Sequence, residues 1–310
     1  MFAKVNGTHL YFDVEGAELV PDGSSWRKKP TCFVVHGGPG GEHIGFKPFL
    51  TPLSESIQLI YIDQRGCGRS ERGPQSTYTL ENNVEDLEAL RNYLGLEQVI
   101  VLGHSYGGMV AQRYAIRYPD SVSALLLIAT SPSHIFGEQA MRKIEEIGTE
   151  DQKRMAKHLF EGTMEKHQMA EFSIVMEPLY FYSSRGKVRT EAEKAAMKNK
   201  KSNFNLKAAN EGATFLKTFD LVDQLLQISC PTLVAGGRYD WITPVEASIL
   251  LAQKIPDSEL VIFEKSCHYL FIDQNSEFIL RISSFINKRF GLQKIVNTEV
   301  SKYEGSISRH

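Results

Sequence analysis

A strand, a cramped turn and a helix follow one another without a break in VIVLGHSYGGMVA, residues 99–111. The apolar run predicts a buried strand, and the residues after the turn have helical spacing. Between them, Ser105 stands between Gly103 and Gly107 in the pattern G-x-S-x-G. Side chains at the two glycines would collide with the neighbouring strand and helix, and the strained turn would lift the serine hydroxyl above a sheet. The stretch therefore favours a fold in which helices start where buried strands end.

Short apolar runs alternate with helical segments on both sides of this turn. The runs TCFVVHG, IQLIYID, VIVLGHS and SALLLIAT end in glycine, proline or polar turn residues, as is typical of strands buried on both faces. Between them, LENNVEDLEALRNYLG places Val84, Leu87, Leu90 and Leu94 on one helical face, and GGMVAQRYAIRYP is a second helical segment. The alternation predicts an α/β fold with a parallel sheet covered by helices on both faces.

The alternation stops after SALLLIAT and returns only with CPTLVAGGRYD and SELVIFEKSCHY. The intervening stretch is charged, rich in methionine and mostly helical in period, so it predicts an inserted helical cap. The expected division is a core at 1–133 and 216–291, a cap at 134–215 and a C-terminal extension at 292–310. Near the N-terminus, MFAKVNGTHLYFDVEG alternates around Asn6-Gly7 and predicts a β-hairpin rather than a signal peptide, whereas PDGSSWRKKP predicts a loop.

Composition narrows the possible functions. The 310 residues are 42% hydrophobic, enough for a substantial core, and the formal net charge is −2 with no long basic run. A near-neutral chain of this kind argues against nucleic acid as a partner. No apolar run approaches the roughly 20 residues that span a bilayer, so no membrane segment is expected.

Cysteine and histidine spacing bear on redox state and metals. None of Cys32, Cys67, Cys230 and Cys267 belongs to a CxxC pair, which favours reduced, structural thiols in a cytoplasmic protein. The histidines show no metal-ligand spacing, so no metal is expected.

A serine nucleophile needs a base, and the base needs a carboxylate to orient it. Asp240, in GGRYDWITP, follows the apolar run PTLVAGG, and His268, in EKSCHY, follows LVIFE. Both positions lie just beyond the C-terminal end of a predicted strand, at the edge of a parallel sheet where ligand sites form. The chain order Ser105, Asp240, His268 is that of the α/β-hydrolases. We therefore expect these three residues to form a catalytic triad.

The glycine-rich stretch HGGPGG, residues 36–41, follows the strand TCFVV. With little side-chain bulk, its backbone can approach a substrate closely. The expected oxyanion hole consists of the N–H groups of Tyr106, at the start of the helix after the turn, and of Gly38, with Gly37 as the alternative. No GKS or GKT follows, which argues against a phosphate-binding loop. His36 is expected to brace this loop.

Five motifs, HGGPGG, DQRGCGRS, GHSYGGMVAQRYA, GRYDWITP and SCHY, together resemble the proline iminopeptidase group of α/β-hydrolases. The resemblance covers most of residues 1–133 and 216–290, and HGGPGG with DQRGCGRS is its most specific part. It implies a cofactor-free serine hydrolase with a helical cap, in which acidic residues from or near the cap hold a free α-amine. The turn reads GHSYGG, whereas many members of the group have GGSWGS.

The cap lacks clear forms of the acidic segments that the resemblance implies. Glu177 in VMEPLYFY and Glu211 in AANEGATF are the candidates for binding an amine, and Tyr180 is a candidate for lining an apolar pocket. The expected activity is that of an aminopeptidase on short peptides or amino-acid amides. A carboxylesterase or lactonase with an apolar acyl pocket is the alternative, and a non-catalytic binding module is a third. The expected protein is a monomer or small homo-oligomer that acts on a small molecule or short peptide.

Overall fold

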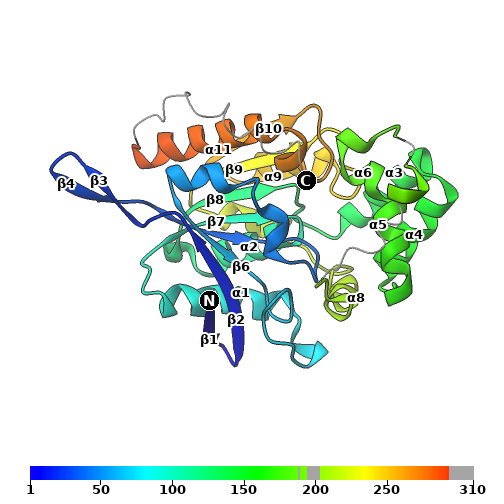
Figure 1. Cartoon of the computed structure of the whole chain (residues 1–310), viewed down its shortest axis with the longest axis horizontal. Coiled ribbons are helices and arrows are strands. Elements are labelled where there is room, and N and C mark those ends of the chain that lie inside the picture. The colour runs from blue at the N-terminus through cyan, green and yellow to red at the C-terminus, as the bar shows by residue number, and fades with distance from the viewer. Residues whose placement is uncertain (188, 194–202, 293–310) are drawn as a thin grey trace.

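The computed structural model describes residues 1–187, 189–193 and 203–292. An eight-stranded sheet runs through its centre in the order β1-β2-β6-β5-β7-β8-β9-β10 (Figure 1). The first two strands pair antiparallel and β2 joins β6 antiparallel, whereas the remaining neighbours are parallel. The strands are β1 (Phe2–Val5), β2 (Thr8–Glu15), β5 (Thr31–Val35), β6 (Gln58–Ile62), β7 (Val99–His104), β8 (Val122–Ile128), β9 (Thr232–Gly237) and β10 (Ser258–Phe263).

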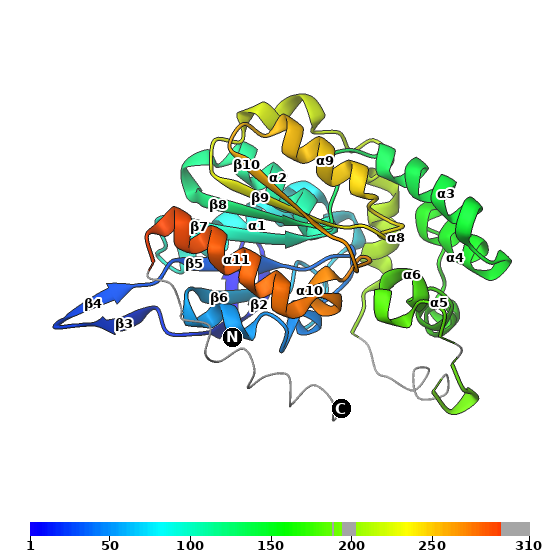
Figure 2. The same ribbon diagram turned by 90° about the horizontal axis from the view of Figure 1, so that it is seen from above.

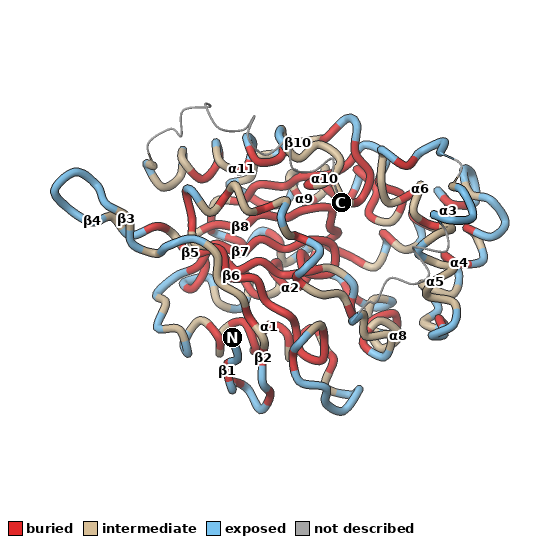
Figure 3. The backbone as a smooth tube through the Cα atoms, viewed as in Figure 1, coloured by how far each residue is buried: buried red, intermediate tan, exposed pale blue. Residues whose placement is uncertain are grey.

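Alternate residues of the central strands enter two separate hydrophobic cores. In β5, Phe33 and Val35 pack with helices α1 (Leu80–Tyr93), α2 (Tyr106–Arg117) and α9 (Val245–Lys254) on one face. Cys32 and Val34 pack on the other face with α10 (Leu270–Asp273) and α11 (Asn275–Phe290). Figure 2 shows these two helices on the opposite side of the sheet from α9. Because both faces are covered, the central strands β5, β7, β8 and β9 are mostly apolar, and Figure 3 shows them buried along most of their length. The predicted, mostly parallel sheet flanked by helices is confirmed.

Two hairpins lie at the N-terminal side of the sheet. The predicted hairpin of β1 and β2 is present, with Asn6 and Gly7 at positive φ in its turn. The prediction of a loop at PDGSSWRKKP is wrong, because residues within it form β4 (Ser25–Lys28), which pairs with β3 (Leu19–Asp22). This second hairpin projects from the body of the molecule (Figure 1). Its strands are mostly exposed, so they show no apolar alternation that would predict them.

Helices between residues 135 and 215 lie beyond one end of the sheet (Figure 1). Where this segment leaves and rejoins the core, Ser133 and Asp220 form an isolated β-bridge, flanked by a hydrogen bond from His134 N–H to Phe219 O. Met155, Met176 and Trp241 belong to its apolar core. The helices are α3 (Ile135–Ile147), α4 (Glu150–Glu161), α5 (Met169–Val175), α6 (Glu177–Tyr180) and α8 (Leu206–Phe215).

Short 3₁₀ helices complete the described structure, at His43–Phe46, Thr51–Glu55, Gln75–Thr77, Pro119–Ser121, Lys166–Gln168, Tyr182–Ser184 and Val222–Gln227. In the part of the chain that the structure describes, no helix has the length and apolar character needed to cross a membrane. Apart from Leu292, the expected C-terminal extension lies outside the described residues.

Candidate active site

Ser105 occupies the single residue between the end of β7 and the start of α2. Its backbone has φ 55° and ψ −123°, a conformation that side-chain-bearing residues rarely adopt. The flanking glycines permit it, because a Cβ on Gly103 would lie 2.3 Å from Gly107 O and one on Gly107 would lie 2.2 Å from Val35 O. Thr130 Oγ1 also donates a hydrogen bond of 2.7 Å to Ser105 O. Packing on both sides therefore holds the serine at a sharp turn.

His268 and Asp240 are brought together by the loops that follow β10 and β9. His268 Nδ1 lies 2.8 Å from Asp240 Oδ2, and both side chains are almost completely buried. An ionised carboxylate only accepts hydrogen bonds, so Nδ1 carries the proton and Nε2 is left with a lone pair. The imidazole therefore has the tautomer that a general base requires.

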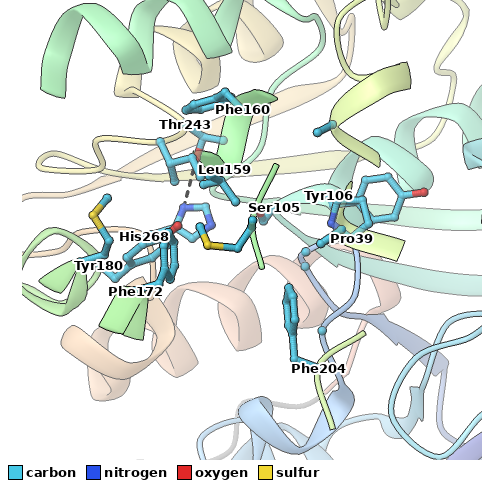
Figure 4. A pocket seen from close by; sticks show the side chains of 18 of the residues that line it. Pro39, Ser105, Tyr106, Leu159, Phe160, Phe172, Tyr180, Phe204, Thr243 and His268 are labelled. Atoms are coloured by element: carbon cyan, nitrogen blue, oxygen red, sulfur yellow. Dashed lines mark hydrogen bonds between the residues drawn. The ribbon is translucent and has the colours of Figure 1, made fainter. Parts of the chain in front are cut away.

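Three further donors hold the carboxylate of Asp240 in place. The backbone N–H groups of Ile242 and Thr243 donate to Oδ1 at 3.0 Å, and Thr243 Oγ1 donates to Oδ2 at 2.7 Å. Thr243 Oγ1 also lies 3.4 Å from His268 Nδ1 (Figure 4). The sequence did not indicate this role for Thr243, although a threonine three residues after an aspartate in DWIT is a signal for such a local turn.

His104, the residue before the serine, contacts the same imidazole. Its Nε2 donates to the carbonyl oxygen of His268 at 3.1 Å, and the two rings are 4.7 Å apart. Burial, with a smaller contribution from His268, lowers the pKa of His104 well below its usual value. His104 is therefore a neutral donor that fixes the backbone of His268, a role that the sequence did not indicate.

The glycine-rich loop after β5 passes directly beside the serine. A Cβ on Gly37 would lie 2.9 Å from Ser105 Cβ, and Gly37, Gly38 and Tyr106 all line the same cavity as Ser105. Tyr106 is the first residue of α2, so its N–H has no intrahelical acceptor. These positions suit an oxyanion site in which Gly38 or Gly37 provides the second donor beside Tyr106.

His36 braces this loop, and Asp63 holds His43, two residues beyond the loop. The backbone N–H of Gln64 donates to His36 Nε2 at 3.0 Å, so Nδ1 carries the proton and donates to Gly37 O at 2.8 Å. The buried Asp63 accepts hydrogen bonds from the backbone N–H and the ring of His43, both at 2.8 Å. Burial raises the pKa of Asp63, but the hydrogen bonds from His43 and other donors outweigh it, so the net shift is downward.

A cavity of about 1540 Å³ lies between the core and the cap. Ser105 and His268 both line it, together with Tyr106 and Pro39 from the core and Tyr180 from α6 (Figure 4). Most of its remaining lining is apolar and comes from the cap helices. The catalytic candidates thus face a cavity with room for a substrate larger than most small-molecule sites accept.

The three expected substrate contacts fare differently. Tyr180 lines the cavity, and its ring meets the His268 ring edge-on at 5.6 Å. Glu177 also lines it, but its carboxylate is held by the guanidinium of Arg189, through Nε at 2.8 Å and through Nη2. Glu211 lies outside the cavity lining and accepts a hydrogen bond of 2.9 Å from Gln75 Nε2. The sequence could not show these directions, because a helical period does not place a long side chain.

Comparisons with known proteins agree with this architecture. Residues 30–274 match the family described as alpha/beta hydrolase fold. The chain is 33% identical over 298 residues to the proline iminopeptidase PfmaB of Pestalotiopsis fici, covering 93% of this chain and 99% of that protein.

Two solved structures share the fold. The proline iminopeptidase of Mycobacterium smegmatis has a TM-score of 0.71 at 21% identity, covering 93% of this chain and 98% of that one. An esterase from Exiguobacterium antarcticum has a TM-score of 0.70 at 21% identity, covering 92% and 98% respectively. The family match and the similarity to PfmaB show that the chain belongs to the α/β-hydrolase fold family, in its proline iminopeptidase-like group, and is a hydrolase.

Proposed function

We propose that this hydrolase is a serine aminopeptidase of the proline iminopeptidase type, which releases the N-terminal residue of short peptides or amino-acid amides. The observation that carries the proposal is the hydrogen bond from His268 Nδ1 to Asp240 Oδ2, at the edge of a cavity that Ser105 also lines. The name of PfmaB and the motifs HGGPGG and DQRGCGRS support the choice of an aminopeptidase.

The reaction proceeds through an acyl-enzyme. His268 Nε2 takes the hydroxyl proton of Ser105 while Oγ attacks the scissile carbonyl carbon and the carbonyl electron pair moves onto oxygen. The N–H groups of Tyr106 and of Gly38 or Gly37 stabilise the oxyanion. The oxyanion then re-forms the carbonyl, the C–N bond breaks, and His268 gives its proton to the leaving nitrogen. Water repeats the attack on the acyl group, and the carboxylic acid departs as Ser105 regains its proton.

A free α-amine needs a carboxylate in the cavity whose charge is not already compensated. Glu177 is held by Arg189, so an amine would have to displace a guanidinium there. Glu42, beside the oxyanion loop, also lines the cavity. Its carboxylate accepts from the backbone N–H and the side-chain amide of Asn203, which are neutral groups. Glu42 is therefore the better-placed carboxylate for the amine.

A carboxylesterase or lactonase is the second candidate. The pairing of Glu177 with Arg189 and the mostly apolar cavity favour it, because an ester substrate needs no carboxylate for recognition. Both candidates use the same nucleophile, base and oxyanion donors. They differ only in what the cap and the mouth of the cavity recognise.

The experiment that tests the proposal compares kcat/KM for prolyl- and alanyl-4-nitroanilides, a short-chain 4-nitrophenyl ester and an acyl-homoserine lactone. Turnover of the free-amine anilides, with much weaker turnover of their N-acetyl forms, is the expected result. Turnover of the ester or lactone but of no free-amine substrate would exclude the aminopeptidase and favour the second candidate. The Ser105→Ala variant serves as the blank in each assay.

A further inference from the structure

The cap side of the cavity forms a continuous apolar surface, which we name the apolar compartment. Its residues are Phe136, Leu159, Phe160, Met164, Phe172 and Met176. They come from four cap segments that are separate in sequence, and Figure 4 shows Leu159, Phe160 and Phe172 around Ser105 and His268. Phe136, Met164 and Met176 are at most 5% exposed and the other three are half-buried, so these side chains are largely shielded from solvent.

Aromatic contacts connect the apolar compartment to the catalytic candidates. Phe172 meets Tyr180 at 6.2 Å between ring centroids, and Tyr180 in turn meets His268 at 5.6 Å. On the other side, Phe160 meets Trp241, the residue after Asp240, at 6.3 Å. Only the ring of Tyr180 therefore separates Phe172 from His268, so a group bound in the apolar compartment would lie close to the reacting bond.

Charged residues also line the cavity. Those from the cap are exposed, namely Glu138, Arg142, Lys166 and Lys207, except for the half-buried Glu177, which is held by Arg189; Lys217, just beyond the cap, is exposed as well. The exposed charges mark the solvent side of the cavity. During the reaction the leaving group must exit and water must enter, whereas the acyl group stays covalently attached. The solvent side therefore suits the leaving group, and the more shielded apolar side suits the acyl group.

Size and flexibility add to this assignment. The cavity, at about 1540 Å³, exceeds the roughly 300–1,000 Å³ of typical small-molecule sites, so a prolyl ring would leave most of it unfilled. Five of the chain's eight methionines line it, at positions 109, 141, 164, 169 and 176. Methionine side chains adapt to ligands of different shape. A compartment lined by such side chains can bind bulky apolar groups of different shapes.

We infer that the apolar compartment binds the acyl part of the substrate and selects large apolar acyl groups, either aromatic or medium-chain aliphatic, over the prolyl group. This inference rests on the proposed acyl-enzyme at Ser105, and it holds for an amide or an ester substrate. Its basis is the burial of Phe136, Met164 and Met176 and the chain of ring contacts from Phe172 through Tyr180 to His268.

The test measures kcat/KM for 4-nitrophenyl esters from acetate to decanoate and for prolyl-, leucyl- and phenylalanyl-4-nitroanilides. Each methylene buried in the compartment is expected to raise kcat/KM about fourfold up to about eight carbons, from ~0.8 kcal/mol per methylene. Among any anilides turned over, the phenylalanyl or leucyl compound is expected to exceed the prolyl one. Esters that peak at acetate, or a prolyl compound preferred over both others, would overturn the inference.

A matched pair of variants on α4 distinguishes binding in the apolar compartment from a general effect of substrate hydrophobicity on kcat/KM. Leu159→Trp fills the compartment and is expected to lower kcat/KM for octanoate relative to acetate by at least tenfold. Lys157→Trp, on the exposed side of the same helix, is expected to leave that ratio unchanged. If Leu159→Trp misfolds, Leu159→Phe provides the milder version. An unchanged ratio in a folded Leu159 variant would also overturn the inference.

Labelling by a fluorophosphonate distinguishes failure of the inference from failure of the proposed function. Labelling that Ser105→Ala removes, with a preference for short acyl groups, would overturn only the compartment's role. Labelling that persists in Ser105→Ala, or is absent from the wild-type protein, would overturn the proposed nucleophile and the inference with it.

Discussion

The backbone N–H of Asn205 donates a hydrogen bond of 2.7 Å to the carbonyl oxygen of Gly40. The same residue's Nδ2 donates to Gly66 O at 2.7 Å, and its Oδ1 accepts from the N–H of Lys207 at the start of α8. A Cβ on Gly40 would lie 2.4 Å from Asn205 O, so the two segments are in close contact. Asn205 thus joins the cap, the oxyanion loop and the DQRGCGRS loop.

Asn205→Ala is expected to lower kcat about tenfold with a smaller change in KM, because a loosened loop misplaces the oxyanion donors. Its free energy of unfolding is expected to fall by about 1–2 kcal/mol through loss of the helix cap and a side-chain hydrogen bond. Asn205→Asp keeps the capping oxygen but not the donor to Gly66, so it should retain more stability yet remain slow. Thr214→Ala, exposed on the same helix, is the control. A normal kcat in Asn205→Ala would contradict this role.

His104→Phe keeps an aromatic ring but removes the donor to His268 O. We expect kcat to fall by about one to two powers of ten while KM changes little, because the general base loses its alignment with Ser105. Since the lowered pKa keeps His104 neutral, the acid limb of the kcat–pH profile should keep its shape. Steady-state kinetics across pH 5–9 check both points. Wild-type kcat in this variant would show that His104 only packs.

Two buried histidines should make the fold sensitive to mild acid. Burial lowers the pKa values of His36 and His104 below the unfolded value of about 6.5. Below that pH the unfolded chain binds more protons than the folded one. The contribution of the two neutral histidines to the free energy of unfolding is therefore fully present above about pH 6.5 and is lost as the pH falls. Each histidine contributes at most about 1.4 kcal/mol per pH unit. Urea unfolding at pH 5, 6, 7 and 8 should show a shallower dependence in His104→Phe, and an equal slope would contradict the assignment.

Two variants test which glutamate, Glu42 or Glu177, binds the substrate amine. Glu42→Gln is expected to raise KM for free-amine anilides at least tenfold while leaving N-acylated or ester substrates nearly unaffected, since only the former carry an ammonium group. Glu177→Gln is expected to act less selectively, because it breaks the ion pair with Arg189 and so disturbs the cap. Parallel kinetics on matched free-amine and N-acetyl substrates measure the difference. Equal effects of Glu42→Gln on both classes would remove Glu42 from amine recognition.

The sequence predicted the sheet, the helices that flank it and the strand–turn–helix at Ser105, because each leaves a local pattern. Strands buried on both faces must be apolar throughout, and the crowded turn requires glycine at 103 and 107. The approach of His268 to Asp240 was expected because parallel strands present their carboxyl ends at one edge. Their hydrogen bond agrees with that expectation, although the catalytic roles stay predictions until tested.

Other features depend on contacts between distant segments. The hydrogen bond of His104 spans 164 residues and that of Asn205 to Gly66 spans 139, so no local pattern reveals them. The direction in which Glu177 points depends on its ion pair with Arg189, and that of Glu211 depends on its hydrogen bond from Gln75. The hairpin of β3 and β4 was missed because its exposed strands carry turn-forming and charged residues.

The central claim is that Ser105 forms the acyl-enzyme with His268 as its base. Intact-protein and peptide mass spectrometry after brief incubation with a 4-nitrophenyl ester and an acid quench tests it most directly, with His268→Gln as a parallel sample in which acylation is expected to be much slower. The account predicts an added acyl mass on the peptide containing Ser105 and none in Ser105→Ala. An acyl mass on another residue, or turnover by Ser105→Ala at the wild-type rate, would contradict it.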